Sequence, residues 1–505
     1  MLNKFRTLLG HTVIYGLGNY GIKIIGFLLI PLYTRYLTTA DYGVMALVSM
    51  YTQVMFILMN LGQSTSLFRF YYEHDTEEGR ERVVAASLWI VILFAVPLAA
   101  VPFLFNRPLA DLILGSESWW FLMCLGTATV LCKVLLRMPF AIMRANDQSK
   151  RYAAWSLARN ALGMVLAVVL VAVFHLGATG VVLSQFLAEL VFCFLLTGVT
   201  FRMLRAGFHW QDIKEQLLFG LPFVPVGAAS FTLDLTNRWF LKHYYSTSEV
   251  GIFSLGYRFA EILTFVVTAF QLSWPQFLFR HRKEENAPRL YADMTAYYLA
   301  LMLFLWLNLA VFAPELLRIM ATPAFYPAAA VIPIISFALV FDGMGFMFNI
   351  GALFSKKTIL RTISVTTAAV VNVTLNFILI PRYGMMGAAW ATFIGFLVQM
   401  STTLLLSLRV YHVPYRYGRM LIMLSAALGI YAASTFVETS SVAASIALKI
   451  PLILLYPAAL LASGLFDPKD VASALMWVER RVPQAAVAVR YVRPLLPGVR
   501  DATGR

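Results

Sequence analysis

The chain has 505 residues, of which 60% are hydrophobic and 13% are charged, and its formal net charge is +15. A soluble domain is usually about 45–50% apolar and about 25% charged, so this composition excludes a soluble globular protein and predicts a membrane protein.

Apolar segments long enough to cross a bilayer recur along the whole chain. About 20 apolar residues span the hydrocarbon core. A backbone in lipid must satisfy its own hydrogen bonds, and these segments lack the alternation of barrel strands, so we expect an all-α polytopic protein. The first segment has no small-residue cleavage pattern and is expected to stay as a signal-anchor helix. We predict fourteen transmembrane helices, at 11–33, 43–66, 83–105, 119–138, 155–175, 179–200, 217–241, 250–275, 290–313, 328–353, 363–381, 386–408, 419–437 and 441–464.

Lys and Arg residues are divided unevenly between the two sets of loops. With a cytoplasmic N-terminus, 29 of them fall in the cytoplasmic loops and the C-terminal tail, and five fall in the opposite loops. Positive residues concentrate on the cytoplasmic side, so both termini are predicted to be cytoplasmic. The net charge then reflects orientation and contact with anionic lipids, and no nucleic-acid partner is expected. The five outer cations are Arg35, Arg107, Lys242, Arg318 and Arg382.

Two short motifs occur twice at nearly the same separation. Residues 36–44 read YLTTADYGV and return as YYSTSEVGI at 244–252, and residues 176–181 read LGATGV and return as YGMMGA at 383–388. Many carriers consist of two similar halves that alternate access to a central site. The repeat therefore predicts a carrier with two equivalent halves.

The repeat also predicts the domain organisation. Because six is an even number, two six-helix lobes enter the membrane in the same sense and are related by an axis along the membrane normal. The last two helices have no counterpart and are expected at the periphery. We predict a first lobe at 1–210, a second lobe at 211–415, two extra helices at 416–465 and a basic cytoplasmic tail at 466–505.

Charged residues inside the predicted helices are the first candidates for function. Each costs at least ~2.5–3.5 kcal/mol near the bilayer centre unless it faces protein or water. The candidates are Lys23, Lys133, Arg159, Glu189, Asp234, Arg238, Arg258, Glu261, Asp342 and Lys449.

Two equivalent helices each carry a polar pair with a spacing of four. Asp234 and Arg238 share one face of helix seven, where they form either an intrahelical ion pair or part of an aqueous cavity. Asn19 and Lys23 share one face of helix one, the counterpart of helix seven. Cations offered from both helices towards one axis predict an anion site, although Lys23 has the alternatives of snorkelling or pairing with Glu189.

The remaining intramembrane charges have weaker signals. Arg258 and Glu261 lie three apart near the end of helix eight, where a cavity position and a structural pair are about equally expected. Lys133, Arg159 and Lys449 are expected at the membrane interface.

The sequence contains no convincing cofactor-binding motif. Residues 16–21 fit a dinucleotide fingerprint with Asp41 at the expected distance, but no strand precedes them, and close helix packing explains the glycines better. There is no phosphate-binding loop followed by Lys-Ser or Lys-Thr. Cys124, Cys132 and Cys193 have neither disulfide nor metal spacing. We therefore expect no cofactor, no metal and no enzymatic activity.

Three stretches of the chain resemble a known family. Residues 31–43, residues 237–241 with 250–260, and residues 380–389 are similar to the signatures of polysaccharide-type lipid-linked oligosaccharide flippases in the multidrug/oligosaccharidyl-lipid/polysaccharide exporter superfamily. The resemblance runs along nearly the whole chain and agrees with the fourteen-helix count.

The resemblance implies a flippase of the bacterial inner membrane. Such a carrier moves undecaprenyl-diphosphate-linked oligosaccharide between leaflets by alternating access, for O-antigen in lipopolysaccharide, capsule or exopolysaccharide assembly. It also implies membrane lipids, a polysaccharide polymerase and chain-length machinery as partners. The alternatives are a multidrug or lipid II exporter of the same superfamily and, from another class, a membrane-embedded polysaccharide polymerase, for which a cluster of His and carboxylates is missing.

The resemblance further implies roles for the candidate residues. Lys23, Arg238 and Arg258, with Asn19, would bind the diphosphate in a cationic cavity. One departure is Asn237, at a position that is often acidic in the family.

Ion coupling is expected at carboxylates of the second lobe. Asp234 or Asp342 would exchange a proton or a sodium ion, and Asp234 would have to substitute for the acidic residue that the chain lacks at 237.

Overall fold

The computed structural model describes residues 27, 29–355, 359–437, 439 and 441–462. Within these residues the chain forms helices and turns and no strand, which confirms the all-α prediction. The α-helices are α2 (Ile30–Tyr36), α3 (Thr39–Asn60), α4 (Gln63–Glu73), α5 (Glu77–Ile90), α6 (Val96–Leu104), α7 (Asn106–Leu114), α8 (Trp120–Ala145), α9 (Ser149–Val168), α10 (Gly177–Arg202), α11 (Trp210–Gly220), α12 (Phe223–Tyr244), α13 (Thr247–Ala260), α14 (Leu263–His281), α15 (Ala287–Val311), α16 (Ala313–Met320), α17 (Val331–Phe348), α18 (Ile350–Ser355), α19 (Ile359–Leu408), α20 (Tyr417–Ser434) and α21 (Val442–Ala462). Short π segments are η1 (Val91–Ala95) and η3 (Val169–Val173), and 3₁₀ segments are η2 (Glu117–Trp119), η4 (Met203–Ala206) and η5 (Pro323–Ala330).

The number of membrane crossings agrees with the prediction. Eleven helical segments in the described part of the chain are long and apolar enough to cross a bilayer, and the bent pair α13–α14 makes a twelfth. α19 is 50 residues long, about twice what one crossing needs. Counted as two, it brings the described residues to thirteen crossings. The predicted first helix, 11–33, lies mostly outside the described residues.

α19 contains a reversal of the chain at Gly384. This residue has φ 55° and ψ −132°, in the left-handed region that favours glycine. A Cβ atom on Gly387 would overlap the carbonyl oxygen of Leu379, and one on Gly395 would lie 3.3 Å from Cβ of Asn372. The segments before and after Gly384 therefore run antiparallel, side by side.

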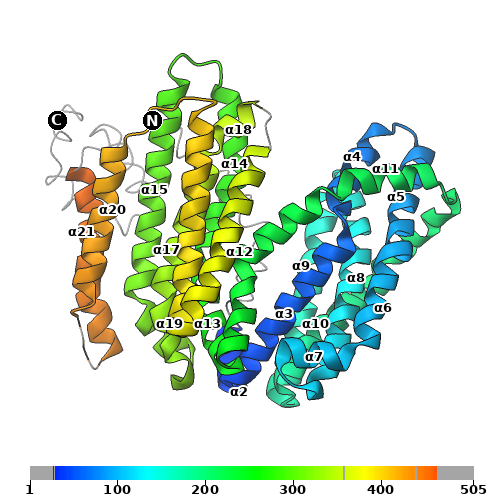
Figure 1. Cartoon of the computed structure of the whole chain (residues 1–505), viewed down its shortest axis with the longest axis horizontal. Coiled ribbons are helices and arrows are strands. Elements are labelled where there is room, and N and C mark those ends of the chain that lie inside the picture. Colours follow the sequence, from blue (N-terminus) through cyan, green and yellow to red (C-terminus); the bar gives the residue numbers. More distant parts are fainter. Residues whose placement is uncertain (1–26, 28, 356–358, 438, 440, 463–505) are drawn as a thin grey trace.

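The helices form two bundles that diverge from a shared lower end in Figure 1. α3–α10 make up one bundle, and α13–α21 make up the other. α11 packs on α4 and α5, whereas α12 packs on α19 and α3, so the α11–α12 segment passes from the first bundle to the second. The lobe boundary at 210/211 stays a prediction.

A buried glutamine fastens α11 to the first bundle. The Gln216 side chain donates from Nε2 to the Val83 carbonyl at 2.9 Å and accepts from Ser87 Oγ at 2.7 Å. Ser66 Oγ donates to the Gln216 carbonyl at 3.0 Å. Since both ends of the amide are satisfied in a buried position, the docking of α11 carries no desolvation penalty from this side chain.

The two copies of the first repeated motif start a helix in the same way. Thr38 caps α3, because Oγ1 accepts from the Asp41 amide at 3.1 Å while the Asp41 carboxylate accepts from the Thr38 amide at 3.1 Å. Ser246 caps α13 by accepting from the Glu249 amide at 3.2 Å. The second motif is also alike in both copies, since Gly177 has φ 56°, close to the value at Gly384. A hydroxyl cap followed by an acid three residues later is thus repeated at 208 residues' separation.

The glycines of this motif allow α3 and α13 to cross backbone to backbone. A Cβ atom on Gly43 would overlap the Thr247 carbonyl oxygen, and a Cβ atom on Gly251 would overlap the Thr39 carbonyl oxygen. The contact is reciprocal, since each glycine faces the threonine that belongs to the other copy. Both helices start at the lower end in Figure 1 and diverge above it, as expected for parallel halves.

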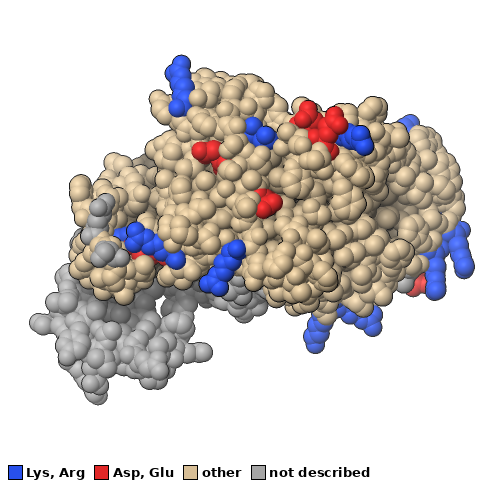
Figure 2. Space-filling model, turned by 90° about the horizontal axis from the view of Figure 1, so that it is seen from below, with Lys and Arg blue, Asp and Glu red and all other residues tan. Residues whose placement is uncertain are grey.

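Further contacts seal the lower end around this crossing. Thr34 Oγ1 donates to the Met320 carbonyl at 3.1 Å, and Thr322 Oγ1 donates to the Thr34 carbonyl at 3.0 Å. The Tyr42 ring lies edge-on to Phe325 with centroids 5.6 Å apart. Seen from below, charged side chains are few and scattered among uncharged residues (Figure 2).

Substitution of Gly43 by valine should open the lower end. The new side chain cannot share the space of the Thr247 carbonyl, so α3 and α13 must separate. Phe325 is 1% exposed, and a Phe325→Cys reporter in a background without the native cysteines is expected to react about tenfold faster with an impermeant maleimide, which corresponds to ~1.4 kcal/mol.

Gly429→Val is the control, because no atom lies within 4 Å of a Cβ at that position. Equal labelling rates in the Gly43→Val and Gly429→Val proteins would contradict the role of the crossing.

Candidate functional site

A cationic pocket lies inside the first bundle. It has a volume of about 320 Å³ and is lined by residues of α3, α8, α9 and α10. α3 and α9 lie on the side of this bundle that faces the other bundle (Figure 1). Four cationic side chains and one carboxylate line the pocket, which leaves an excess of three positive charges: Lys133, Arg137, Arg144, Arg159 and Glu189.

Helical spacing explains how α8 supplies three of these cations. Residues 133, 137 and 144 are separated by four and seven positions, so Lys133, Arg137 and Arg144 point from the same face of α8. α9 adds Arg159, whose Nη1 donates to Glu189 Oε2 at 3.2 Å. The carboxylate is therefore already neutralised by a neighbour, and the cations of α8 stay available.

Aromatic rings hold the arginines of the pocket in position. The Arg137 guanidinium lies over the Phe56 ring at 4.9 Å, and the Arg159 guanidinium lies over Phe140 at 5.3 Å. Stacking on a ring leaves the in-plane N–H donors of a guanidinium free for an anion. Lys133 has no hydrogen-bond or ion-pair partner among the described residues.

A second polar cluster lies in α12 and α13. The Arg238 guanidinium donates from Nη1 to the Asp234 carbonyl at 2.9 Å and from Nε to Ser254 Oγ at 3.2 Å. It also lies over the Tyr257 ring at 5.0 Å. The Asp234 carboxylate instead accepts from the Tyr257 hydroxyl at 3.2 Å. The two side chains thus form no salt bridge, and the intrahelical ion pair that the spacing allowed is absent.

The other predicted residues of the second lobe lie around this cluster or apart from it. Arg258 donates to the Tyr42 hydroxyl at 3.4 Å, so it joins α13 to α3 across the crossing of the two helices. Asp342, on α17, accepts from Gln399 Nε2 at 3.0 Å. Their assignment to substrate and ion binding stays a prediction.

Asn237 belongs to an uncharged polar cluster between α12 and α19. Its Nδ2 donates to Thr392 Oγ1 at 2.6 Å, while Asn376 Nδ2 donates to Asn372 Oδ1 at 3.0 Å. Oδ1 of Asn237, Oδ1 of Asn376 and Nδ2 of Asn372 are buried without a partner in the structure. Asn237, where the resemblance implied an acidic residue, therefore bonds a hydroxyl here.

The predicted site is brought together only in part. Lys23 and Asn19 lie outside the described residues. The alternative partner of Lys23, Glu189, is bonded to Arg159. Lys133 and Arg159 were expected at the interface, whereas the structure has them in one pocket, because α9 and α10 cover that face of α8.

Sequence reasoning missed Arg137 and Arg144, which were assigned to a cytoplasmic loop. α8 continues to Ala145, so both residues lie on its last turns. The spacing of 133, 137 and 144 on one helical face was the signal that could have revealed the pocket.

The two bundles, their crossing helices and the cationic pocket define a polytopic helical protein with the architecture of a membrane carrier. The chain belongs to the polysaccharide biosynthesis protein family, whose model matches residues 8–275. A similar curated protein is the succinoglycan biosynthesis transport protein ExoT of Rhizobium meliloti, which is 25% identical over 303 residues. The match spans 59% of this chain and 59% of the relative, so about three fifths of that protein's length is represented.

Solved structures share the fold at low sequence identity. The lipid II flippase MurJ in an inward closed conformation has a TM-score of 0.72 at 14% identity, covering 90% of this chain and all of that one. An inward-facing multidrug resistance MATE family transporter of the MOP superfamily has a TM-score of 0.63 at 15% identity, covering 77% of this chain and 94% of that one. The fold is therefore that of flippases and exporters.

The cationic pocket should bind a diphosphate. Inorganic pyrophosphate is expected to raise the thermal unfolding midpoint of the solubilised full chain. Lys133→Met should weaken this apparent affinity about tenfold, because a charge-assisted hydrogen bond contributes about 1.5–3 kcal/mol. Added salt should weaken binding further through screening.

Arg107→Met, which removes an exposed cation on α7, is the matched control. An equal affinity of the Lys133→Met and Arg107→Met proteins would show that the pocket does not bind this anion.

Proposed function

We propose that this protein is a flippase that translocates an undecaprenyl-diphosphate-linked oligosaccharide across the bacterial cytoplasmic membrane. The observation that carries the proposal is the excess of three positive charges in a pocket lined by α3, α8, α9 and α10. A diphosphate has about two negative charges and forms charge-assisted hydrogen bonds with Arg and Lys, which are stronger in a partly buried pocket than in bulk water. Family membership and the flippase fold support this substrate class.

The proposed orientation has the open end in the cytoplasm. The turn from α4 to α5 and that from α14 to α15 lie at the upper, diverging ends of the bundles in Figure 1, and they belong to the Lys- and Arg-rich set of loops. The lower end, where Gly43 and Gly251 meet, is then the outer side. This arrangement corresponds to an inward-facing carrier, which is open to the cytoplasm. A lipid-linked oligosaccharide would be loaded from that side.

The transport step then requires the two bundles to separate at the lower end and to come into contact at the upper end. The diphosphate binds Lys133, Arg137 and Arg159 while the sugars occupy the space towards the second bundle. Opening outward breaks the Thr34–Thr322 hydrogen bond and separates α3 from α13. Two states of rigid bundles around one site are sufficient for alternating access.

The other expected roles belong to the same proposal. Lys23, Asn19, Arg238 and Arg258 would also bind the diphosphate in the inward-facing state, and Asp234 or Asp342 would exchange the coupling ion. A polysaccharide polymerase and chain-length machinery would receive the product on the outer side.

A proteoliposome assay tests the proposal. Leaflet translocation of a fluorescent undecaprenyl-diphosphate oligosaccharide is measured for the intact protein and for Arg137→Gln, Lys133→Met and Arg238→Gln at equal reconstitution. Loss of one charge-assisted contact should lower the initial rate about tenfold or more in each variant. Arg107→Met should transport at the intact rate.

A multidrug exporter is the second candidate, because Asp234 and Asp342 offer carboxylates in the second bundle and the fold is shared with such transporters. Efflux of a lipophilic cation from the same proteoliposomes, abolished by Asp234→Asn and unaffected by Lys133→Met, would favour it. Translocation of lipid II at a higher rate than the oligosaccharide would overturn the proposed substrate.

A further inference from the structure

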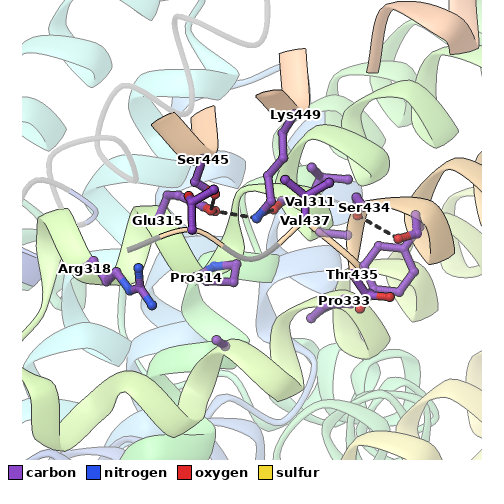
Figure 3. Close-up of a pocket in the computed structure, with 14 residues that line it drawn as sticks. Val311, Pro314, Glu315, Arg318, Pro333, Ser434, Thr435, Val437, Ser445 and Lys449 are labelled. Carbon is purple, nitrogen blue, oxygen red and sulfur yellow. Dashed lines mark hydrogen bonds and ion pairs between the residues drawn. The ribbon is translucent and has the colours of Figure 1, made fainter. Parts of the chain in front are cut away.

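Two hollows meet at the lower end of the second bundle, away from the cationic pocket. One is polar, has a volume of about 630 Å³ and lies between α15, α16, α17, α20 and α21 (Figure 3). The other is lined almost wholly by apolar side chains, has a volume of about 520 Å³ and lies between α14, α15, α16 and α21. Glu315 lines both hollows, so they adjoin at α16.

A buried ion pair marks the boundary between the hollows. Lys449 Nζ lies 2.6 Å from Glu315 Oε1 and donates to the Val311 carbonyl at 3.1 Å, and Ser445 Oγ also bonds Glu315 Oε1. Lys449 is 6% exposed and Glu315 is 3% exposed. α21 packs Lys449 inwards against α15 and α16, and the interfacial depth expected for this residue stays a prediction.

One acceptor of this pair is left unused. Glu315 Oε2 is buried and has no hydrogen-bond partner in the structure. An unpaired carboxylate oxygen in a buried site costs about 1–3 kcal/mol or more, so a ligand that brings an N–H or O–H donor gains by meeting it. Such a donor is the first requirement on the occupant.

The polar hollow also favours an anion. Lys449 and Glu315 neutralise each other, and Arg318 at one side of the hollow adds an uncompensated positive charge (Figure 3). A guanidinium can bind a phosphate through two parallel hydrogen bonds. Five hydroxyl side chains complete the polar lining: Tyr431, Ser434, Thr435, Thr439 and Ser445.

The apolar hollow shows that the occupant also has an apolar part. Its lining includes Phe265, Leu305, Leu309 and Ile446, whose side chains offer no hydrogen-bond partner to a sugar or an ion. An apolar chain that leaves the water–lipid boundary gains about 0.8 kcal/mol for each buried CH₂ group. The occupant thus joins a phosphate and a donor-bearing headgroup to an apolar chain.

We propose that this double hollow binds a glycerophospholipid from the leaflet at the lower end of the protein. The phosphate lies at Arg318, the hydroxyl or ammonium of the headgroup donates to Glu315 Oε2, and one acyl chain lies between α14 and α21. The lipid fills the two hollows beside the contact of α21 with α15 and α16. This site is independent of the proposed transport substrate and of the cationic pocket.

The chemistry of the headgroup makes the proposal testable. Phosphatidylglycerol and phosphatidylethanolamine carry O–H or N–H donors, whereas phosphatidylcholine with the same acyl chains carries none. Added to delipidated full-length protein and followed by native mass spectrometry, the first two lipids should bind at least about tenfold more tightly than the third, which corresponds to ~1.4 kcal/mol. Equal binding of all three lipids would overturn the proposal.

Two variants separate the contacts. Arg318→Ala should weaken all three lipids, whereas Arg382→Ala, which removes another exposed cation of the outer loops, should weaken none. The double variant Glu315→Gln with Lys449→Gln keeps the site uncharged and should abolish the preference over phosphatidylcholine. If the double variant does not fold, Arg318→Ala against Arg382→Ala still decides the outcome, since equal affinities refute the site.

A polyprenyl lipid is the competing occupant. Undecaprenyl phosphate is added to the protein loaded with phosphatidylglycerol, and the proposal requires that it does not displace the phospholipid at equal concentration. If undecaprenyl phosphate displaces phosphatidylglycerol from the intact protein but not from the Arg318→Ala protein, the hollow binds the polyprenyl lipid and the phospholipid proposal is refuted. Neither result depends on whether Lys133→Met lowers oligosaccharide transport. The test of the lipid site and the test of the proposed function can therefore fail separately.

Discussion

The close crossing of α3 and α13 is the contact on which the rest of the structure depends. Gly43 and Gly251 bring two backbones so near that a single Cβ atom on either would overlap a carbonyl oxygen. The crossing ties the first bundle to the second at one end and lets them diverge at the other (Figure 1). Because packed helices shift between discrete arrangements, a contact of this kind acts as a latch that is either made or broken.

The charges inside the membrane are accommodated in three different ways. Lys449 and Glu315 neutralise each other. Arg238 is satisfied by a hydroxyl, a carbonyl and an aromatic ring, although no carboxylate pairs with it. Among the described residues, the lining of the cationic pocket has an excess of three positive charges. Unpaired charge in a membrane protein is costly. The excess of positive charge in this pocket is therefore explained most simply by the binding of an anionic ligand.

The expected crossings and the repeat could be predicted because both depend on local sequence. Lipid requires about 20 apolar residues per helix, and the caps at Thr38 and Ser246 act within one turn. The site was predicted less well. Arg238 was chosen for its spacing from Asp234, but its guanidinium bonds the carbonyl of that residue, because Tyr257 from α13 reaches the carboxylate first. A neighbour that is distant in sequence decided the pairing.

The sequence by itself determined the membrane environment, the helical class and the repeated start of α3 and α13, because hydropathy and capping act over a few residues. Only the tertiary structure decided that Lys133, Arg137 and Arg159 share one pocket and that Glu315 meets Lys449. Arg159 bonds Glu189 across 30 residues of sequence, and Lys449 bonds Glu315 across 134. Which helix faces they share depends on how whole helices pack, and that is a property of the folded bundles.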